Sequence, residues 1–132
     1  MNFILDTSIY IEMERENKRI LEKIIEISAK QKSFLFISSP TYSEVYYGIL
    51  KRSSDKEIKL HNLNETPLVG TTKNSARICA ELKLELERKG KPIPIFDLII
   101  ASIAIDRDMT LITTDEHFKK ISKLKKIIVS ED

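Results

Sequence analysis

Four carboxylates could act together in this chain, although they lie far apart in its sequence. They are Asp6, Glu44, Asp97 and Asp115. If they met in one cleft, each close pair would cost about 4 kcal/mol at a separation of ~4 Å and an effective dielectric constant near 20. A hard divalent cation would offset this repulsion, and Mg²⁺ is usually bound by one or two carboxylates, waters and a substrate phosphate. The set therefore indicates metal-assisted hydrolysis of a phosphodiester, with one ion or two.

Each of these acids also has an ordinary structural interpretation. Asp6 and Asp115 could cap the short helices that follow them, and Asp97 could be the N-cap of an apolar helix. Glu44 lies between apolar positions of a predicted helix, where a solvent-facing glutamate is common. It is the combination of the four, rather than any single member, that favours a functional site.

The elements that must position these acids alternate between strands and helices. Apolar runs predict strands, and apolar residues at helical spacing predict helices. The predicted strands are 2–5, 34–37, 67–69, 110–113 and 127–129, and the predicted helices are 8–13, 18–30, one beginning near Pro40 with Ser39 or Thr41 as its cap, 55–63, 74–89, 97–106 and a short one around Phe118. This order predicts an α/β fold with a mainly parallel sheet of about five strands, flanked by helices.

The positions of two acids along this pattern predict where the site lies. In open α/β sheets, ligands bind outside the carboxyl ends of the strands. Asp6 and Asp115 each come directly after an apolar strand, so both should lie at that edge. The stretch from Asp97 to Asp106 is apolar almost all round, which predicts a largely buried helix.

Composition limits the classes of protein that remain. The chain has 132 residues and 42% hydrophobic content, which predicts one domain over residues 1–132. No apolar run approaches the ~18 residues of a membrane span, so we expect a cytoplasmic protein. Lys and Arg number 22 against 20 Asp and Glu, so any nucleic-acid binding must depend on local basic clusters. Cys79 is the only cysteine, which excludes an intramolecular disulfide.

Short motifs around the four acids are similar to those of a known family. They are Leu-Asp6-Thr7-Ser8, Ser-Glu44-Val-Tyr-Tyr-Gly48, Pro-Ile-Pro-Ile-Phe-Asp97-Leu-Ile-Ile-Ala101 and Thr113-Thr-Asp115-Glu-His-Phe118. In order and spacing, over essentially the full chain, they resemble a PIN-domain ribonuclease of the VapC toxin type. One departure is Ser8, because the family more often has Asn there and a hydroxyl donates one hydrogen bond where an amide donates two.

The resemblance implies an acidic pocket that binds Mg²⁺, or Mn²⁺ as a substitute, and cleaves RNA endonucleolytically. By position, Asp6 and Asp97 would be the main metal ligands. Glu44 and Asp115 would complete the pocket, as ligands, through metal-bound water or as a general base, and Thr7 and Thr113 would orient carboxylates. The resemblance also implies a homodimer and a cognate antitoxin that blocks the pocket.

Three other functions fit parts of the sequence. A phosphoacceptor signalling domain also uses an acidic metal pocket. Such a domain has paired acids after its first strand, however, whereas Asp6 stands alone here. A PIN-like module could bind RNA or a partner without cutting it, through the basic clusters and an exposed Tyr46 or Tyr47. A metal-independent ribonuclease could use His61 and His117 as acid and base.

Overall fold

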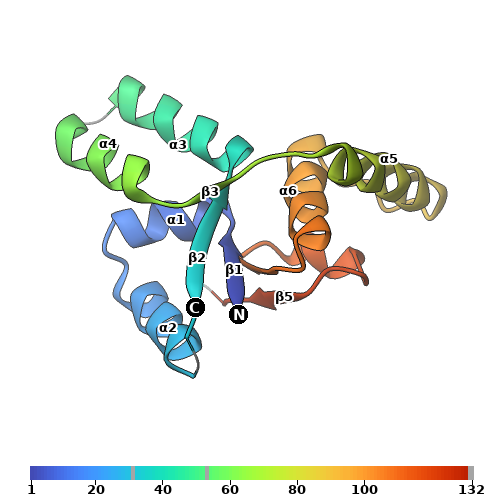
Figure 1. Cartoon of the computed structure of the whole chain (residues 1–132), viewed down its shortest axis with the longest axis horizontal. Coiled ribbons are helices and arrows are strands. Elements are labelled where there is room, and N and C mark those ends of the chain that lie inside the picture. Colours follow the sequence, from blue (N-terminus) through green and yellow to red (C-terminus); the bar gives the residue numbers. More distant parts are fainter. Residues whose placement is uncertain (31, 53, 131–132) are drawn as a thin grey trace.

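The computed structural model describes residues 1–30, 32–52 and 54–130. Strands and helices alternate along the chain (Figure 1). The elements are β1 (Asn2–Leu5), α1 (Thr7–Glu14), α2 (Lys18–Ala29), β2 (Phe34–Ser38), α3 (Ser39–Arg52), α4 (Lys56–Glu65), β3 (Leu68–Val69), α5 (Lys73–Arg88), α6 (Ile95–Asp106), β4 (Thr110–Thr113), the 3₁₀ helix η1 (Glu116–Lys120) and β5 (Lys126–Ile128).

The five strands form one parallel sheet in the order β3-β2-β1-β4-β5. The central strand β1 pairs with β2 on one side and with β4 on the other, with Ile4 opposite both Phe36 and Leu111. The predicted α/β class and parallel sheet are therefore confirmed. Because the strands are parallel, the carboxyl ends of β1, β2 and β4 lie at one edge of the sheet, where Asp6, Ser38 and Thr113 stand.

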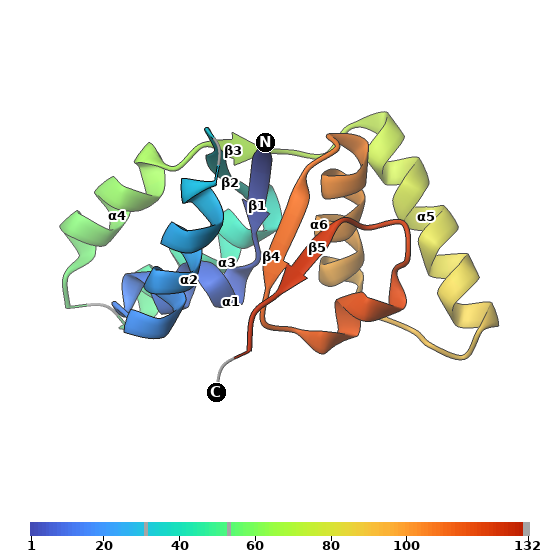
Figure 2. The same cartoon turned by 90° about the horizontal axis from the view of Figure 1, so that it is seen from below.

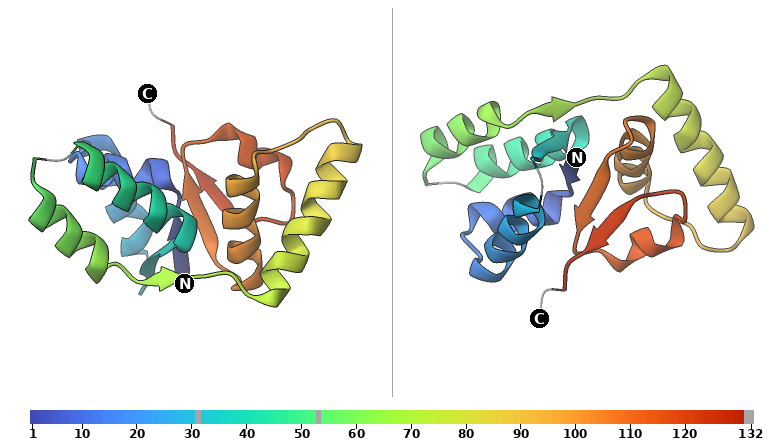
Figure 3. Two further views of the ribbon diagram at one scale, coloured as in Figure 1. Left: turned by 90° about the horizontal axis from the view of Figure 1, so that it is seen from above. Right: turned by 60° about the horizontal axis from the view of Figure 1, so that its bottom comes forward.

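Both faces of the sheet are buried, as the continuous apolar runs require. Successive side chains of a strand point to opposite faces, so Ile4 packs with residues of α5 and α6, whereas Phe3 and Leu5 pack with residues of α1 to α4. Figure 2 shows the sheet between these two groups of helices. In both views of Figure 3, α3 and α4 run side by side at one end of the molecule, and α5 lies at the other end.

Of the predicted helix starts, that of α2 is exact, and those of α1, α3, α4, α5 and α6 differ from the structure by one or two residues. Helix α6 begins at Ile95, with Pro94 as its N-cap, so Asp97 lies in the first turn and is not the cap. A proline fits this boundary because its fixed φ suits a helix start and it lacks the N–H that would remain unpaired. Helix α3 is capped by Ser38, whose Oγ accepts a hydrogen bond from Thr41 N at 3.2 Å, rather than by Ser39 or Thr41.

Helix α6 has the burial that its composition predicts. Its buried side chains are Leu98, Ile100, Ala101, Ser102, Ile103 and Ala104, and they fix the position of the first turn that carries Asp97. Among the described residues, none of the helices has the length and hydropathy needed to cross a bilayer.

Candidate active site

Asp6 links the end of β1 to the start of α1. Its backbone N–H donates to Ile112 O at 2.9 Å, which holds it against β4. Its Oδ1 accepts from Thr7 N at 2.9 Å, so the residue is the N-cap of α1. Its Oδ2 accepts from the Thr113 hydroxyl at 2.6 Å and from the Ser8 hydroxyl at 3.5 Å. Burial raises the pKa of Asp6, while the Thr113 and Thr7 hydrogen bonds oppose that rise.

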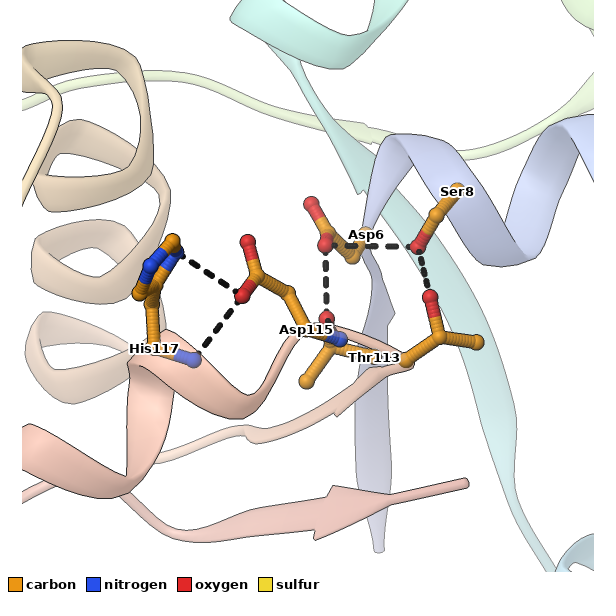
Figure 4. Close-up of polar contacts among 6 residues, drawn as sticks. Asp6, Ser8, Thr113, Asp115 and His117 are labelled. Carbon is orange, nitrogen blue, oxygen red and sulfur yellow. Dashed lines mark hydrogen bonds and ion pairs between the residues drawn. The ribbon is translucent and has the colours of Figure 1, made fainter. Parts of the chain in front are cut away.

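Thr113 connects Asp6 to Asp115. Its hydroxyl donates to Asp6 and accepts from Asp115 N at 3.0 Å. Asp115 is the N-cap of η1, since its Oδ1 accepts from His117 N at 2.8 Å. The same oxygen lies 3.0 Å from His117 Nδ1. Figure 4 shows the Asp115 carboxylate between His117 and Asp6, and Asp115 contributes to the raised pKa of Asp6.

Glu44 reaches the site from α3 through a chain of hydroxyl groups. The Thr7 hydroxyl donates to Glu44 Oε1 at 3.0 Å, so its single proton is used there. The Thr41 hydroxyl, 3.0 Å away, must then donate to Thr7, and Ser38 in turn donates to Thr41 at 3.2 Å. Because Ser38 and Thr41 are fully buried, this chain fixes the carboxylate of an otherwise exposed glutamate.

The charges of all three other acids affect the pKa of Asp97. Burial, followed by the charges of Asp6, Asp115 and Glu44, raises the pKa of Asp97 to about 6, and the charge of His117 opposes that rise. The charges of Asp6, Glu44 and Asp115 thus act on Asp97, and we call these four acids the carboxylate cluster. They come from the ends of β1 and β4 and from α3 and α6, as an edge site in a parallel sheet requires.

The donor set suits a hard divalent ion. All four side chains offer carboxylate oxygens as ligands. Among the described residues, the one positive charge that lowers the pKa of Asp97 is that of His117. In the described part of the chain, no three acidic, His or Cys side chains already stand close enough to enclose an ion. Mg²⁺ needs only one or two carboxylates together with waters.

Two contributors to the site were not predicted. His117 was predicted only as part of a metal-independent pair with His61, but His61 lies on α4, across the molecule from the segment 116–120 (Figure 2). His117 instead contacts Asp115 two residues before it, a spacing that an N-cap allows. Ser38 and Thr41 were considered only for the strand end and the helix cap, and nothing in the sequence indicates that their hydroxyls reach Glu44.

Comparison with known proteins gives consistent results. A family model described as PIN domain matches residues 3–124. Ribonuclease VapC2 of Rickettsia felis is 31% identical over 128 residues, covering 94% of this chain and 95% of that protein. Ribonuclease VapC3 of Methanocaldococcus jannaschii is 32% identical over 103 residues, covering 78% and 98%. The crystal structure of VapBC2 from Rickettsia felis, bound to a DNA fragment from its promoter, superposes with a TM-score of 0.83 at 30% identity, covering 98% of this chain and 100% of that one.

Proposed function

Since the chain belongs to the PIN-domain family and to its VapC type, we propose that it is a Mg²⁺-dependent endoribonuclease, the toxin of a toxin–antitoxin pair, with Mn²⁺ as a substitute ion. The observation that carries the proposal is Asp97. Its pKa is raised to about 6 by burial and by the charges of Asp6, Asp115 and Glu44. A cluster that destabilises its own charged form is suited to a site that gains a cation.

The four acids take different parts in this proposal. Asp6 and Asp97 are the main ligands, and Asp115 completes the site directly or through water. Thr113 holds Asp6 and the Asp115 backbone, and Thr7 holds Glu44, so both are positioning residues. Fixed ligands keep the geometry ready for the ion, which is why such partners affect metal affinity.

The reaction is hydrolysis of an RNA phosphodiester. Held by Asp6 and Asp97, Mg²⁺ would supply Lewis-acid polarisation of the phosphoryl oxygen and would lower the pKa of the attacking water. Glu44 would accept a proton from that water: its one hydrogen bond within the described residues is at Oε1, so Oε2 can act as the base. A phosphorus–oxygen bond forms to the water oxygen, the bond to the leaving sugar oxygen breaks, and that oxygen takes a proton from solvent.

The partners follow from the same relatives. The similar structure from Rickettsia felis is a VapBC2 complex on promoter DNA. By analogy, we propose that this chain has a cognate antitoxin that covers the carboxylate cluster. We also propose that residues 1–132 act as one domain and that two copies form a homodimer, as the resemblance implies. The cytoplasmic location stays a prediction from the sequence.

A non-catalytic PIN-like module remains the main competing function. A chain that only binds RNA needs neither four converging carboxylates nor a hydroxyl chain that orients Glu44. The carboxylates add negative charge where RNA would lie, which is a cost for binding alone. The carboxylates and the oriented Glu44 are, by contrast, expected in a catalytic site.

Cleavage of a mixed RNA pool tests the proposed function. We expect Mg²⁺ to support cleavage, EDTA to abolish it, and Asp97→Asn to lower it by at least about 100-fold, as expected for loss of a main ligand. The matched control is Asp108→Asn, which removes an equal charge from a loop where Asp108 pairs with Lys125. Cleavage that survives EDTA, or that Asp97→Asn retains, would contradict the proposal.

A further inference from the structure

A surface pocket adjoins the carboxylate cluster and is not explained by it. The pocket lies where the end of α1 meets α3 and α4, and its volume is about 200 Å³. This is enough for a group the size of several water molecules. Its lining residues are Ile11, Glu14, Arg15, Glu44, Val45, Gly48, Ile49, Arg52 and Lys59. Glu44 belongs both to this wall and to the carboxylate cluster, so the two sites are contiguous.

Two cations of the pocket form no ion pair among the described residues. Arg15 pairs with Glu12 at 3.2 Å. Within residues 1–30, 32–52 and 54–130, by contrast, neither Arg52 nor Lys59 forms an ion pair. Glu14 and Glu44 also line the pocket, but two positive charges that no salt bridge engages can attract an anion there. Arginine in particular suits a phosphate, because its guanidinium can donate two parallel hydrogen bonds.

One helix face leads from the carboxylate cluster to these cations. Glu44, Gly48 and Arg52 follow one another at intervals of four on α3, so they lie along one side of the helix. Gly48 has no side chain, and a Cβ built there would meet no atom within 4 Å. The surface between Glu44 and Arg52 is therefore open, and an extended strand can lie along it.

Glu14 sets the charge of the pocket. Its Oε2 is buried and has no hydrogen-bond partner among the described residues. Burial raises the pKa of Glu14, while Lys59 and Arg15 oppose that rise, so these cations lie close to it. Any anion in the pocket must share them with this carboxylate, and Glu14 therefore limits the affinity for an anion.

We propose that this pocket binds a backbone phosphate of the RNA strand, next to the phosphodiester that is cut; the proposal rests on the proposed function. An RNA strand carries a negative charge at every nucleotide, so a strand placed at the carboxylate cluster needs cations beside it. Positively charged grooves that follow the backbone serve this purpose in proteins that bind single strands. Arg52 and Lys59 supply those charges where α3 leads away from Glu44.

Binding of a dye-labelled single-stranded RNA tests the subsite without catalysis. Fluorescence anisotropy is measured in EDTA with the full chain, and a gel checks that the RNA stays intact. We expect Arg52→Ala and Lys59→Ala each to weaken binding several-fold and to reduce the slope of log affinity against log salt by about 0.7 to 1. Glu14→Gln should tighten binding, because it removes the competing charge and keeps the shape.

The control is Arg88→Ala, an equal loss of charge from the last turn of α5 at the opposite end of the molecule (Figure 3). It should change affinity less than twofold. Arg52→Ala and Lys59→Ala proteins that bind RNA as Arg88→Ala does would overturn the subsite. So would variants that keep RNA affinity and lose affinity for an acidic peptide, since the pocket would then serve a protein partner. A Glu14→Gln protein that binds RNA less tightly would contradict the role of charge.

Hydrolysis of bis(p-nitrophenyl) phosphate separates this inference from the proposed function. That ester has one phosphodiester and no neighbouring phosphate, so in Mg²⁺ the Arg52→Ala and Lys59→Ala proteins should hydrolyse it at the wild-type rate. With RNA, the same variants should show a raised KM. Wild-type protein that hydrolyses neither substrate would contradict the proposed function. The anisotropy series would still test whether the pocket binds RNA.

Discussion

Asp6 can act both as the N-cap of α1 and as a metal ligand, two roles that its position in the sequence leaves open as alternatives. Its Oδ1 caps α1 through Thr7 N, and its Oδ2 faces the hydroxyls of Thr113 and Ser8. A carboxylate has two oxygens and about four acceptor sites, so a structural hydrogen bond leaves capacity for an ion. The same holds for Asp115, which caps η1 and contacts His117 through one oxygen.

Replacing Thr113 by Val should uncouple Asp6 from Asp115. The substitution keeps the shape but removes the donor to Asp6 and the acceptor for Asp115 N. Loss of a partner that orients a ligand typically costs 10- to 100-fold in metal affinity or activity, and we expect that loss in Mg²⁺-dependent RNA cleavage. The control is Thr110→Val on the same strand, whose hydroxyl contacts only Met1 Sδ at 4.0 Å among the described residues. Equal activity of the two variants would refute the role given to Thr113.

Asp97 should make the stability of the protein fall as the pH rises. The pKa of Asp97 is about 6 in the folded protein, against an ordinary value of 3.8, so the folded state holds this proton more tightly than the unfolded chain. The contribution of Asp97 to the free energy of unfolding must then decrease between pH 4 and pH 6. Because the side chain is partly solvated, the effect should be about 1–2 kcal/mol after allowance for screening.

Asp97→Asn removes that penalty. In EDTA at pH 7, urea unfolding should show the variant to be more stable than the wild type by about that 1–2 kcal/mol, and the difference should vanish below pH 4. Asp108→Asn, in an exposed loop, should show no such dependence. A variant less stable than the wild type at pH 7 would mean that Asp97 is not repelled by its neighbours.

At the scale of elements, the start of α3 decides where Glu44 points. Ser38 ends β2, caps α3 through Thr41 N and starts the hydroxyl chain to Glu44. Ser38→Ala should therefore cost about 0.5–2 kcal/mol of unfolding free energy, the usual range for a lost N-cap. It should also lower RNA cleavage, because Thr41 loses the donor that orients it. Ser28→Ala is the control, since among the described residues Ser28 donates only to carbonyls within α2 and alanine favours a helix.

The elements themselves were largely predictable from their apolar patterns. The predicted strands at 2–5 and 110–113 match β1 and β4 to the residue, because buried parallel strands are continuous apolar runs. Helix starts were less predictable. Pro94 and Ser38 are the N-caps of α6 and α3, where Asp97 and either Ser39 or Thr41 were predicted, since several neighbouring residues could each have capped the first turn.

At the scale of the whole molecule, parallel pairing brings the carboxyl ends of distant strands to one edge of the sheet. The order β2-β1-β4 places the ends of these strands side by side, and the sequence sufficed to predict this edge for Asp6 and Asp115. The orientation of Glu44 depends on three hydroxyls, those of Thr7 on α1, of Ser38 at the end of β2 and of Thr41 on α3 itself. The cations Arg52 and Lys59 of the neighbouring pocket come from α3 and α4. No local pattern encodes such tertiary contacts, so only the structure reveals them.

A Mn²⁺ titration followed by electron paramagnetic resonance tests whether the carboxylate cluster holds a functional divalent-metal site. The signal of free Mn²⁺ reports how many ions the protein removes from solution, with wild type, Asp97→Asn and Asp108→Asn compared under the same conditions. We expect saturable binding by wild type and Asp108→Asn, displacement by excess Mg²⁺, and loss of that binding in Asp97→Asn. An Asp97→Asn protein that binds Mn²⁺ as tightly as the wild type would rule out this metal site.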